Sequence, residues 1–513
     1  MFTKYISYEL YKLTGDKKYL DRVMGLHESG IYNRIRSRLD KNDSLKFANV
    51  PIQIQSQEKQ LKSAISSALK GNSAQDEKMT DYFNAVEAWN FFLEKLKVEY
   101  PRYYNLRYAT IFKNFDNIQQ NIPENTTVVR YLFIDKELFA LVADRQMQDI
   151  FPLEIDSLEK SISLLAEQGL TVDQTSAILI GLHQQLWQPI SENIQHKKII
   201  IIPDGVLFNL NFEILTPQRI ASFKEFASKS LLAEYTISNQ YSMLLIHGEA
   251  KATAIENDFV AFAPGFFDEL KTVYGSSRKD SLEMDRSYLY LLPQPFSFSL
   301  AKKIKQQLGG NAFLSDQSTE GVFKANAGNH KIIHIGTHAE SNNDRPEFSR
   351  LIFAKNPSDE DNSLFVDEIY NCNLTSNLTT LSACETGKPG FQEGKGMISL
   401  AHAFNYAGSE SMLTGLWKVD EQASAILLEA FYKNLTKGLE KDEALRQTKL
   451  SYLQNANGRM LAPQYWAGLV IMGDTSPIDL QQKSNFWLML LPGFLLLFVG
   501  GYFVFRRRIK TFD

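Results

Sequence analysis

The sequence predicts an α/β protein in which helices enclose a mainly parallel β-sheet. Three observations support this fold class. Apolar runs of strand length alternate with helical periods over residues 116–476, and residues 1–115 show helical periods only. Residues 485–505 then carry no charge, which predicts one C-terminal transmembrane helix, and residues 506–513 form a basic tail.

The composition is that of a folded protein, with 44% hydrophobic and 22% charged residues in a chain of 513. The formal net charge is −4, so we expect no direct nucleic-acid ligand. The two cysteines, Cys372 and Cys384, are too few for a disulfide framework or a Cys-rich metal site. A single bridge between them is still open at this stage.

The helical region begins with a helix, a turn and a second helix. Residues 8–20 hold Gly15-Asp16 between two stretches of helical spacing, and the second apolar stripe runs from Val23 towards Leu39. This joint resembles that of a tetratricopeptide repeat, although a second period is not visible. Two further helices are predicted, at 57–69 and 82–100.

From about residue 118 the pattern changes to short apolar runs. The runs 128–134 and 138–142 flank an Asp-Lys turn and predict a β-hairpin, and the run 198–203 predicts a strand. Further strands are predicted at 259–263, 332–335, 350–354, 378–381 and 411–415, and helices at 153–168, 171–196, 298–308, 395–407, 419–436 and 440–454. The polar segment 268–293 is predicted to be a surface loop.

Two of these strands end in segments that hold an imidazole and a thiol. Residues 331–338 end in His338, and residues 381–387 contain Cys384. Functional groups in open α/β sheets collect beyond the carboxyl ends of the strands, so we expect both side chains at one edge. A thiolate is a strong nucleophile that a nearby imidazole can activate. A Cys and a His placed in this way are therefore the fewest side chains with which a cysteine hydrolase can work.

In such a hydrolase His338 would take the thiol proton and later protonate the leaving amine. The backbone N–H groups of Ala339 and Cys384 would bind the oxyanion. This chemistry requires no metal ion and no organic cofactor. The alternative is that Cys384 is a small buried apolar residue and His338 a loop histidine with satisfied hydrogen bonds.

The motifs around these residues resemble those of the CHAT domain family, over roughly residues 100–474. They follow the family's order at 202–207, 212–215, 333–338, 381–387, 394–400, 415–420 and 465–469. CHAT domains are caspase-like cysteine peptidase domains of clan CD that are found with tetratricopeptide repeats. The resemblance therefore implies a caspase-like sandwich with His338 and Cys384 as the catalytic dyad.

One position departs from the family's pattern. Ala339 stands where a Gly usually follows the second His, which adds a methyl group where positive φ or close substrate approach could be needed. Glu385 could shape the site or cap the helix that begins near Gly396. Asp420 lies where caspase-like peptidases build part of the substrate pocket, and it could equally be the N-cap of the next helix. His334 is expected to be structural.

The C-terminal stretch 485–505 is long enough to cross a hydrocarbon core of about 30 Å. Trp487 and Tyr502 lie near its ends, and the basic residues 506–510 follow. The basic tail favours the cytoplasmic side, which would place the body outside, yet residues 1–20 show no export signal. Either the body is cytoplasmic, as in a tail-anchored protein, or this chain lacks an upstream signal.

These observations favour a membrane-anchored, caspase-like cysteine endopeptidase that cleaves a protein partner in regulated proteolysis. The resemblance implies control by an upstream sensor. The alternative is a catalytically silent CHAT scaffold that binds regulatory proteins at the membrane. Ala339 favours the scaffold, whereas the intact His338 and Cys384 favour the peptidase. An acyltransferase or another Cys-dependent transferase has no motif support.

Overall fold

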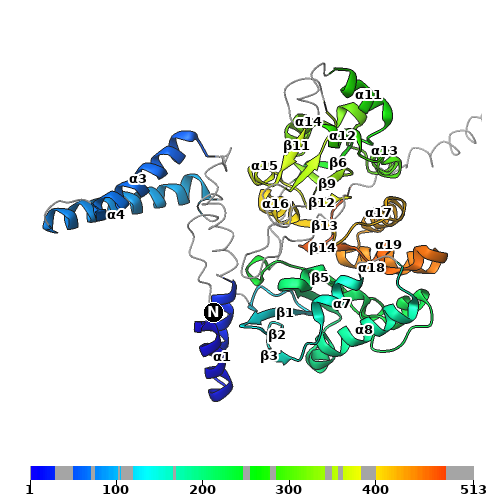
Figure 1. The fold of residues 1–513 in the computed structure, drawn as a ribbon, viewed down its shortest axis with the longest axis horizontal. Helices are drawn as coiled ribbons and strands as arrows, with labels where there is room; N and C mark the ends of the chain where they lie inside the picture. Colours follow the sequence, from blue (N-terminus) through cyan, green and yellow to red (C-terminus); the bar gives the residue numbers. More distant parts are fainter. Residues whose placement is uncertain are drawn as a thin grey trace, which may run out of the picture.

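The computed structural model describes residues 2–28, 50–70, 75–101, 104, 119–165, 169–246, 255–277, 285–340, 349–355, 362–382 and 400–480. These residues form an 11-stranded sheet, a three-stranded sheet and the helices around them (Figure 1). Most strand pairs of the large sheet are parallel. The predicted α/β fold with a large, mainly parallel sheet is confirmed.

The first part of the large sheet combines a hairpin with two parallel strands. β1 (Thr126–Ile134) and β2 (Glu137–Ala143) form the predicted hairpin, and β3 (Gln148–Leu153) pairs antiparallel with β2. β4 (Lys198–Ile202) pairs parallel with β1, and β5 (Thr236–Asn239) pairs parallel with β4.

The second part of the large sheet carries the predicted site. Its strands are β6 (Asn257–Ala263), β7 (Asn311–Leu314), β8 (His330–Ile335), β12 (Leu378–Leu381), β13 (Ser411–Gly415) and β14 (Leu469–Gly473). The strand order of the whole sheet is β3-β2-β1-β4-β5-β14-β13-β12-β8-β6-β7. The parts meet where Met472 of β14 pairs with Asn239 of β5. Central strands such as β8 read as apolar runs because both of their faces are buried.

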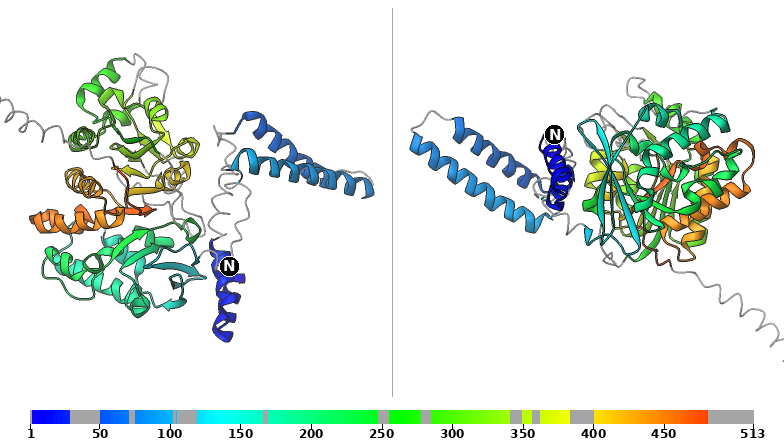
Figure 2. Two further views of the ribbon diagram at one scale, coloured as in Figure 1. Left: turned by 180° about the vertical axis from the view of Figure 1, so that it is seen from behind. Right: turned by 90° about the horizontal axis from the view of Figure 1, so that it is seen from below.

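Helices cover both sides of the strands (Figures 1 and 2). The longer helices are α7 (Leu158–Leu165), α8 (Val172–Leu186), α13 (Pro295–Leu308), α14 (Glu320–Asn326), α15 (Val366–Asn371), α16 (Leu400–Ala407), α17 (Glu421–Leu435) and α18 (Lys441–Asn455). Four-residue helices are α9 (Phe226–Lys229), α10 (Leu231–Glu234) and α19 (Pro463–Trp466). α17 packs between α13 and α18 in one layer, while α15 packs on α16 across the sheet.

The N-terminal helices share a core with the sheet. α1 (Phe2–Thr14) and the helix at 17–28 are joined by Gly15, whose φ of 66° suits the tight turn between them. Tyr8 and Leu20 of these helices belong to one apolar cluster with residues of β1 and β2. Side chains alternate along β1, so its other face packs in the main core.

A buried ion pair joins Glu28 of the second helix to the sheet. The Glu28 carboxylate accepts a hydrogen bond from Arg130 Nε at 2.9 Å, and both residues are at most 1% exposed. The same carboxylate accepts from the Ser242 hydroxyl and from the backbone N–H of Met243. The described part of this helix is therefore held by polar contacts as well as by apolar packing.

A second pair of helices touches the body through Tyr406 of α16, which packs against their apolar cluster. α3 (Ile52–Lys70) and α4 (Gln75–Glu99) form a hairpin that extends away from the body (Figure 2). Phe92 and Leu96 of α4 are buried in the small cluster between them.

Three predicted elements differ in the structure. The segment 268–293 is not a loop throughout, because it contains α11 (Asp268–Ser277) and α12 (Arg286–Leu289). Within 153–168, β3 ends at its first residue and helix begins only at α7. The strand at 350–354 is β10 (Arg350–Ile352), which belongs to the small antiparallel sheet. Its partners are β9 (His338–Glu340) and β11 (Ser363–Phe365).

The predicted transmembrane helix at 485–505 lies outside the described residues. Of the helices within residues 2–480 that the structure describes, none has both the length and the apolar character needed to span a membrane.

Candidate active site

The two strand ends that carry the predicted dyad are hydrogen-bonded to each other. The backbone N–H of Ser382, just after β12, donates to the carbonyl oxygen of Ile335 at the end of β8, at 2.9 Å. Ser382 is two residues before Cys384, and Ile335 is three residues before His338. Cys384 itself lies outside the described residues, as does Glu385. The structure therefore brings together the segments that lead to both residues and describes one of the two side chains.

A tight turn between β8 and β9 presents His338. The N–H of Gly336 donates to the carbonyl oxygen of Phe262 at 2.9 Å, and the Thr337 hydroxyl donates to the carbonyl of Ile352. These bonds fix the turn to β6 on one side and to β10 on the other. His338 is then the first residue of β9.

The hydrogen bond of the His338 ring determines its tautomer. Nε2 lies 2.8 Å from the carbonyl oxygen of Leu292. A carbonyl oxygen can only accept, so Nε2 carries the hydrogen and the lone pair of the neutral ring is on Nδ1. The Phe266 ring lies 5.1 Å away between centroids and supports one face of the imidazole. Nδ1 is therefore the basic nitrogen of this ring.

The surroundings of His338 favour its neutral form. Burial lowers the pKa of the imidazole below its usual 6.5, and the positive charges of Lys418 and Lys271 lower it further. The Leu292 carbonyl and Glu340 act in the opposite direction without reversing the effect. At neutral pH the ring is consequently an unprotonated base, as acceptance of a thiol proton requires.

Ala339 adopts a backbone conformation that tolerates its methyl group. It lies within β9 and pairs with Leu351 of β10 in an antiparallel register. Extended backbone has negative φ, which any L-residue adopts. Ala339 therefore does not adopt the positive φ that a Gly at this position would allow.

The remaining predicted site residues have structural roles in the part of the chain that is described. Asp420 is the N-cap of α17, where its carboxylate accepts from the N–H of Ala423 at 2.9 Å. His334 is fully buried, its Nδ1 lies 2.9 Å from the Tyr432 hydroxyl, and burial lowers its pKa to about 4. His402 has a similar environment beside Tyr370.

The other cysteine is unsuited to nucleophilic chemistry. Burial raises the pKa of the Cys372 thiol to about 11, and its Sγ lies 3.4 Å from the carbonyl oxygen of Glu368. A thiol with a raised pKa is almost fully protonated near neutral pH. Cys372 therefore offers an internal control for any assay of thiol reactivity.

Sequence reasoning missed the groups that surround His338. Leu292 contributes a backbone carbonyl, which leaves no side-chain signal in the sequence. Tyr290, Leu292 and Phe296 are 82%, 68% and 43% exposed, so apolar side chains lie on the surface of the segment whose Leu292 carbonyl binds the imidazole. An exposed run of this kind is visible in the sequence only as a Tyr- and Leu-rich stretch, which is equally typical of a core.

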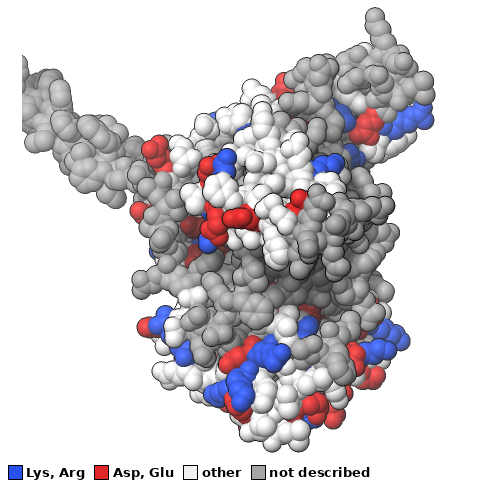
Figure 3. All heavy atoms as spheres, turned by 90° about the vertical axis from the view of Figure 1, so that its left-hand side faces the viewer, with Lys and Arg blue, Asp and Glu red and all other residues white. Residues whose placement is uncertain are grey.

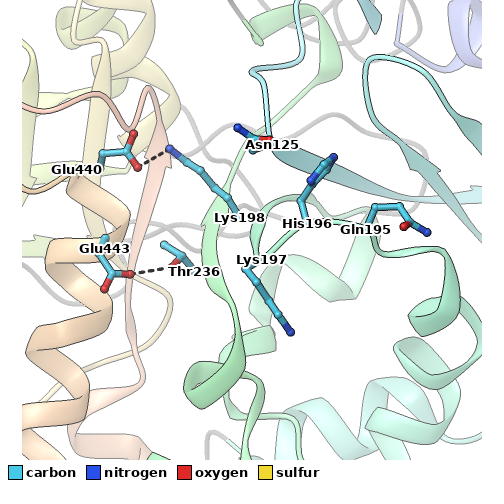
Figure 4. A pocket seen from close by; sticks show the side chains of 8 residues that line it. All are labelled: Asn125, Gln195, His196, Lys197, Lys198, Thr236, Glu440 and Glu443. Atoms are coloured by element: carbon cyan, nitrogen blue, oxygen red, sulfur yellow. Dashed lines mark hydrogen bonds and ion pairs between the residues drawn. The ribbon is translucent and has the colours of Figure 1, made fainter.

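A separate pocket lies at the beginnings of β4 and β5. Its volume is about 390 Å³ and it is lined by Asn125, Gln195, His196, Lys197, Lys198, Thr236, Glu440 and Glu443 (Figure 4). Lys198 pairs with Glu440 at 2.8 Å, and the Thr236 hydroxyl donates to Glu443 at 2.8 Å. None of the predicted site residues lines it. Lys197 pairs with Glu234 and Glu443 with Arg446, both outside the lining, so each Lys and Glu side chain of the pocket already has an ionic partner.

Charged side chains of both signs are interspersed on the described part of the face in Figure 3. Among the described residues, no group of three or more His, Cys, Asp or Glu side chains is arranged to hold a metal ion.

The fold and the paired strand ends define an α/β protein with a candidate Cys-His site at the edge of a mainly parallel sheet. The sequence model of the CHAT domain matches residues 177–474, which is more than half of the chain. The chain belongs to the CHAT domain family.

Curated relatives match over short segments. Tetratricopeptide repeat protein 28 of Mus musculus is 28% identical over 118 residues, which are 23% of this chain and 5% of that protein. Its Homo sapiens counterpart is 35% identical over 90 residues, which are 18% of this chain and 4% of that protein. The matched segment is thus a small fraction of each relative's length.

Solved structures with a similar arrangement share little sequence. The Saccharomyces cerevisiae separase–securin complex shows a TM-score of 0.44 at 10% identity and covers 89% of this chain and 40% of that one. The Arg-specific cysteine proteinase gingipain R shows a TM-score of 0.34 at 10% identity, with 63% and 75% of the two chains covered.

Proposed function

We propose that this protein is a caspase-like cysteine endopeptidase in which Cys384 is the nucleophile and His338 the general base. The observation that carries the proposal is the hydrogen bond between Ser382 and Ile335, which holds the two strand ends side by side. The neutral His338 ring, with its lone pair on Nδ1, supports the same assignment.

The reaction follows from these assignments. His338 Nδ1 takes the proton of the Cys384 thiol, and the thiolate attacks the carbonyl carbon of the scissile peptide bond. Backbone N–H groups of Ala339 and Cys384 would stabilise the resulting oxyanion. The C–N bond then breaks as the imidazolium gives its proton to the leaving amine. Water, deprotonated by the same imidazole, hydrolyses the thioester and restores the thiol.

The surface beside His338 fits a polypeptide substrate. The segment that binds His338 has exposed apolar side chains at Tyr290, Leu292 and Phe296, and Lys271 and Lys418 add positive charge at the imidazole. Exposed apolar groups of this kind commonly bind a partner's side chains. We infer a protein substrate that presents an apolar side chain together with an acidic one.

The test is labelling of the intact chain by a peptide-based, thiol-reactive electrophile over a pH series. We expect rapid labelling at Cys384 with its acid limb below pH 6.5, because the folded environment holds the pKa of His338 below that value. His338→Ala should slow labelling by about 10²- to 10⁴-fold, the usual contribution of general base catalysis.

Cys372→Ser should leave labelling unchanged, because that thiol has a raised pKa and is partly buried. Slow labelling of Cys384 that is indifferent to His338→Ala would contradict the peptidase proposal. That result would favour a catalytically silent CHAT scaffold that acts through bound proteins.

We also propose that residues 485–505 anchor the protein in a membrane. The uncharged length of this segment and the basic residues 506–510 support the proposal.

A further inference from the structure

The segment that supports His338 leads directly into a helix. Leu292 accepts the His338 hydrogen bond, and α13 begins three residues later at Pro295. Between them, the N–H of Gln294 donates to the carbonyl oxygen of Gly265 at 2.8 Å. The position of the Leu292 carbonyl therefore depends on how the first turn of α13 is held.

One carboxylate from another helix holds that turn. Glu421 is the first residue of α17, and its Oε1 accepts from the N–H of Phe296 at 2.8 Å and from the N–H of Ser297 at 2.9 Å. The first N–H groups of a helix lack partners within the helix, and a negative charge there is favoured by the helix dipole. Gln294, which precedes α13, makes no side-chain cap of its own.

The same helical turn also contacts the turn that presents His338. A methyl group added to Gly336 would overlap the Ser297 hydroxyl, so the Ser297 side chain packs against the backbone of Gly336. The first turn of α13 thus lies between Glu421 on one side and the β8–β9 turn on the other. A displacement of this helical turn would move both Leu292 and the surface against which Gly336 rests.

Burial and hydrogen bonding act in opposite directions on the Glu421 carboxyl group. Burial raises the pKa of Glu421 above its usual value, although the two N–H donors act to lower it. A raised carboxyl pKa means that the ionised form lowers the stability of the folded protein at neutral pH relative to an unburied carboxylate.

We propose that Glu421 is a positioning residue for His338, acting through the first turn of α13 and the carbonyl of Leu292. The contacts that lead from Glu421 to His338 are those described above. The consequence for catalysis rests on the proposed peptidase function.

A second pair between the same two helices provides the control. Lys303 of α13 and Glu429 of α17 form an exposed ion pair at 2.6 Å. If Glu421 acts only by joining α13 to α17, loss of either contact should have a similar effect on His338. If Glu421 positions His338, only the loss of Glu421 should change the properties of His338.

The experiment compares Glu421→Ala, Glu421→Gln and Glu429→Ala in the full chain. Three quantities are measured: hydrogen exchange of the amides of residues 294–297, the pKa of His338 from NMR of its ring, and the rate of Cys384 labelling by the peptide electrophile. The first two do not depend on catalysis. They test the positioning role even if the peptidase proposal fails.

For Glu421→Ala we expect faster exchange at Phe296 and Ser297 and a His338 pKa that rises towards 6.5 as the ring loosens. Labelling should slow by about 10- to 100-fold, the scale expected when a catalytic group moves by about an ångström. Glu421→Gln retains an acceptor oxygen and should restore most of each quantity. Glu429→Ala should change none of them.

Two results would overturn the inference. In the first, Glu421→Ala and Glu429→Ala give the same His338 pKa and the same exchange at 294–297. In the second, exchange rises in Glu421→Ala while the pKa of His338 stays at its wild-type value, which would make Glu421 a helix cap alone. If Glu421→Ala fails to fold, Glu421→Asp replaces it, because its side chain is one methylene shorter. An unshifted His338 pKa together with unaltered labelling in Glu421→Asp would then contradict the inference.

Discussion

The buried pair of Glu28 and Arg130 gives the sharpest prediction about stability. Arg130 Nη1 donates to the backbone carbonyls of Tyr131, Ile202 and Pro203, and its Nε donates to Glu28. Replacing Arg130 with Met would leave the Glu28 carboxylate buried with only neutral donors. Replacing Glu28 with Gln would leave an arginine that keeps three carbonyl acceptors.

The two single substitutions should therefore differ in cost. Removing one partner of a buried pair typically costs about 3–5 kcal/mol, because the other charge is left uncompensated. We expect Arg130→Met to lie at the upper end of this range and Glu28→Gln at or below its lower end. The double variant should cost less than the sum of the two, by about 2 kcal/mol or more, because it removes the stranded charge.

Urea titration of the full chain followed by pulse proteolysis measures these free energies of unfolding. Lys12→Ala serves as the matched control, because Lys12 pairs with Glu9 on the exposed face of the N-terminal helices. A surface pair of this kind contributes about 0–1 kcal/mol. Additive costs in the double variant, or an Arg130→Met cost equal to that of Lys12→Ala, would refute the reasoning.

Two further predictions concern the site and the C-terminus. Gly336→Ala should destabilise the protein by about 1–3 kcal/mol in the same titration, because the added methyl overlaps the Ser297 hydroxyl, and Ser297→Gly should restore part of the loss. Equal stability with and without Ser297→Gly would contradict the contact. The full chain should stay with membranes after alkaline carbonate extraction, whereas a chain ending at residue 480 should be released. Equal release of both would contradict the proposed anchor.

The strands and long helices were predictable because each has a local cause. β4 and β8 are apolar runs because the sheet buries both of their faces. α17 was predicted at 419–436 and spans Glu421–Leu435, because Asp420 supplies a cap and the apolar period continues to its end. Such elements need no information from distant parts of the chain.

The segment 268–293 was mispredicted because its partners are distant in sequence. Leu270 and Tyr274 are one helical turn apart and are buried in a cluster that includes Tyr288 and Ile352. A short helix with two apolar anchors and otherwise polar residues is not distinguishable from a loop by its own pattern. The helix forms because tertiary packing supplies the stability that the sequence period lacks.

The candidate site shows the same limit. The sequence identified His338 through its place after a strand, and the structure adds the tautomer, which a backbone carbonyl determines. Backbone groups carry no side-chain identity, so no motif could have indicated Leu292. The role of Glu421 could not be predicted either. An acidic residue in the first turn of a helix is common because it favours that helix's own dipole, so nothing in the sequence indicates that this one binds a different helix.

The buried contacts also bear on what constitutes one folding unit. The family match begins at residue 177, and the sequence predicts a boundary at 115/116 between repeat-like helices and the α/β part. Yet the helix that contains Glu28 shares an apolar cluster with β1 and β2 and forms an ion pair with Arg130, which lies before the matched region. A chain that began at residue 116 or at residue 177 would expose that cluster. A chain that began at residue 116 would also leave the buried Arg130 without its carboxylate partner.

The contacts continue from this helix towards the segment that contains Cys384. The Glu28 carboxylate holds Ser242 and Met243, and the preceding Tyr241 packs edge-on against His402 at 5.3 Å between ring centroids. His402 lies in the first turn of α16, the first element described after residues 383–399. A chain of contacts therefore joins Glu28, through residues 241–243, to the helix that follows residues 383–399 in the sequence.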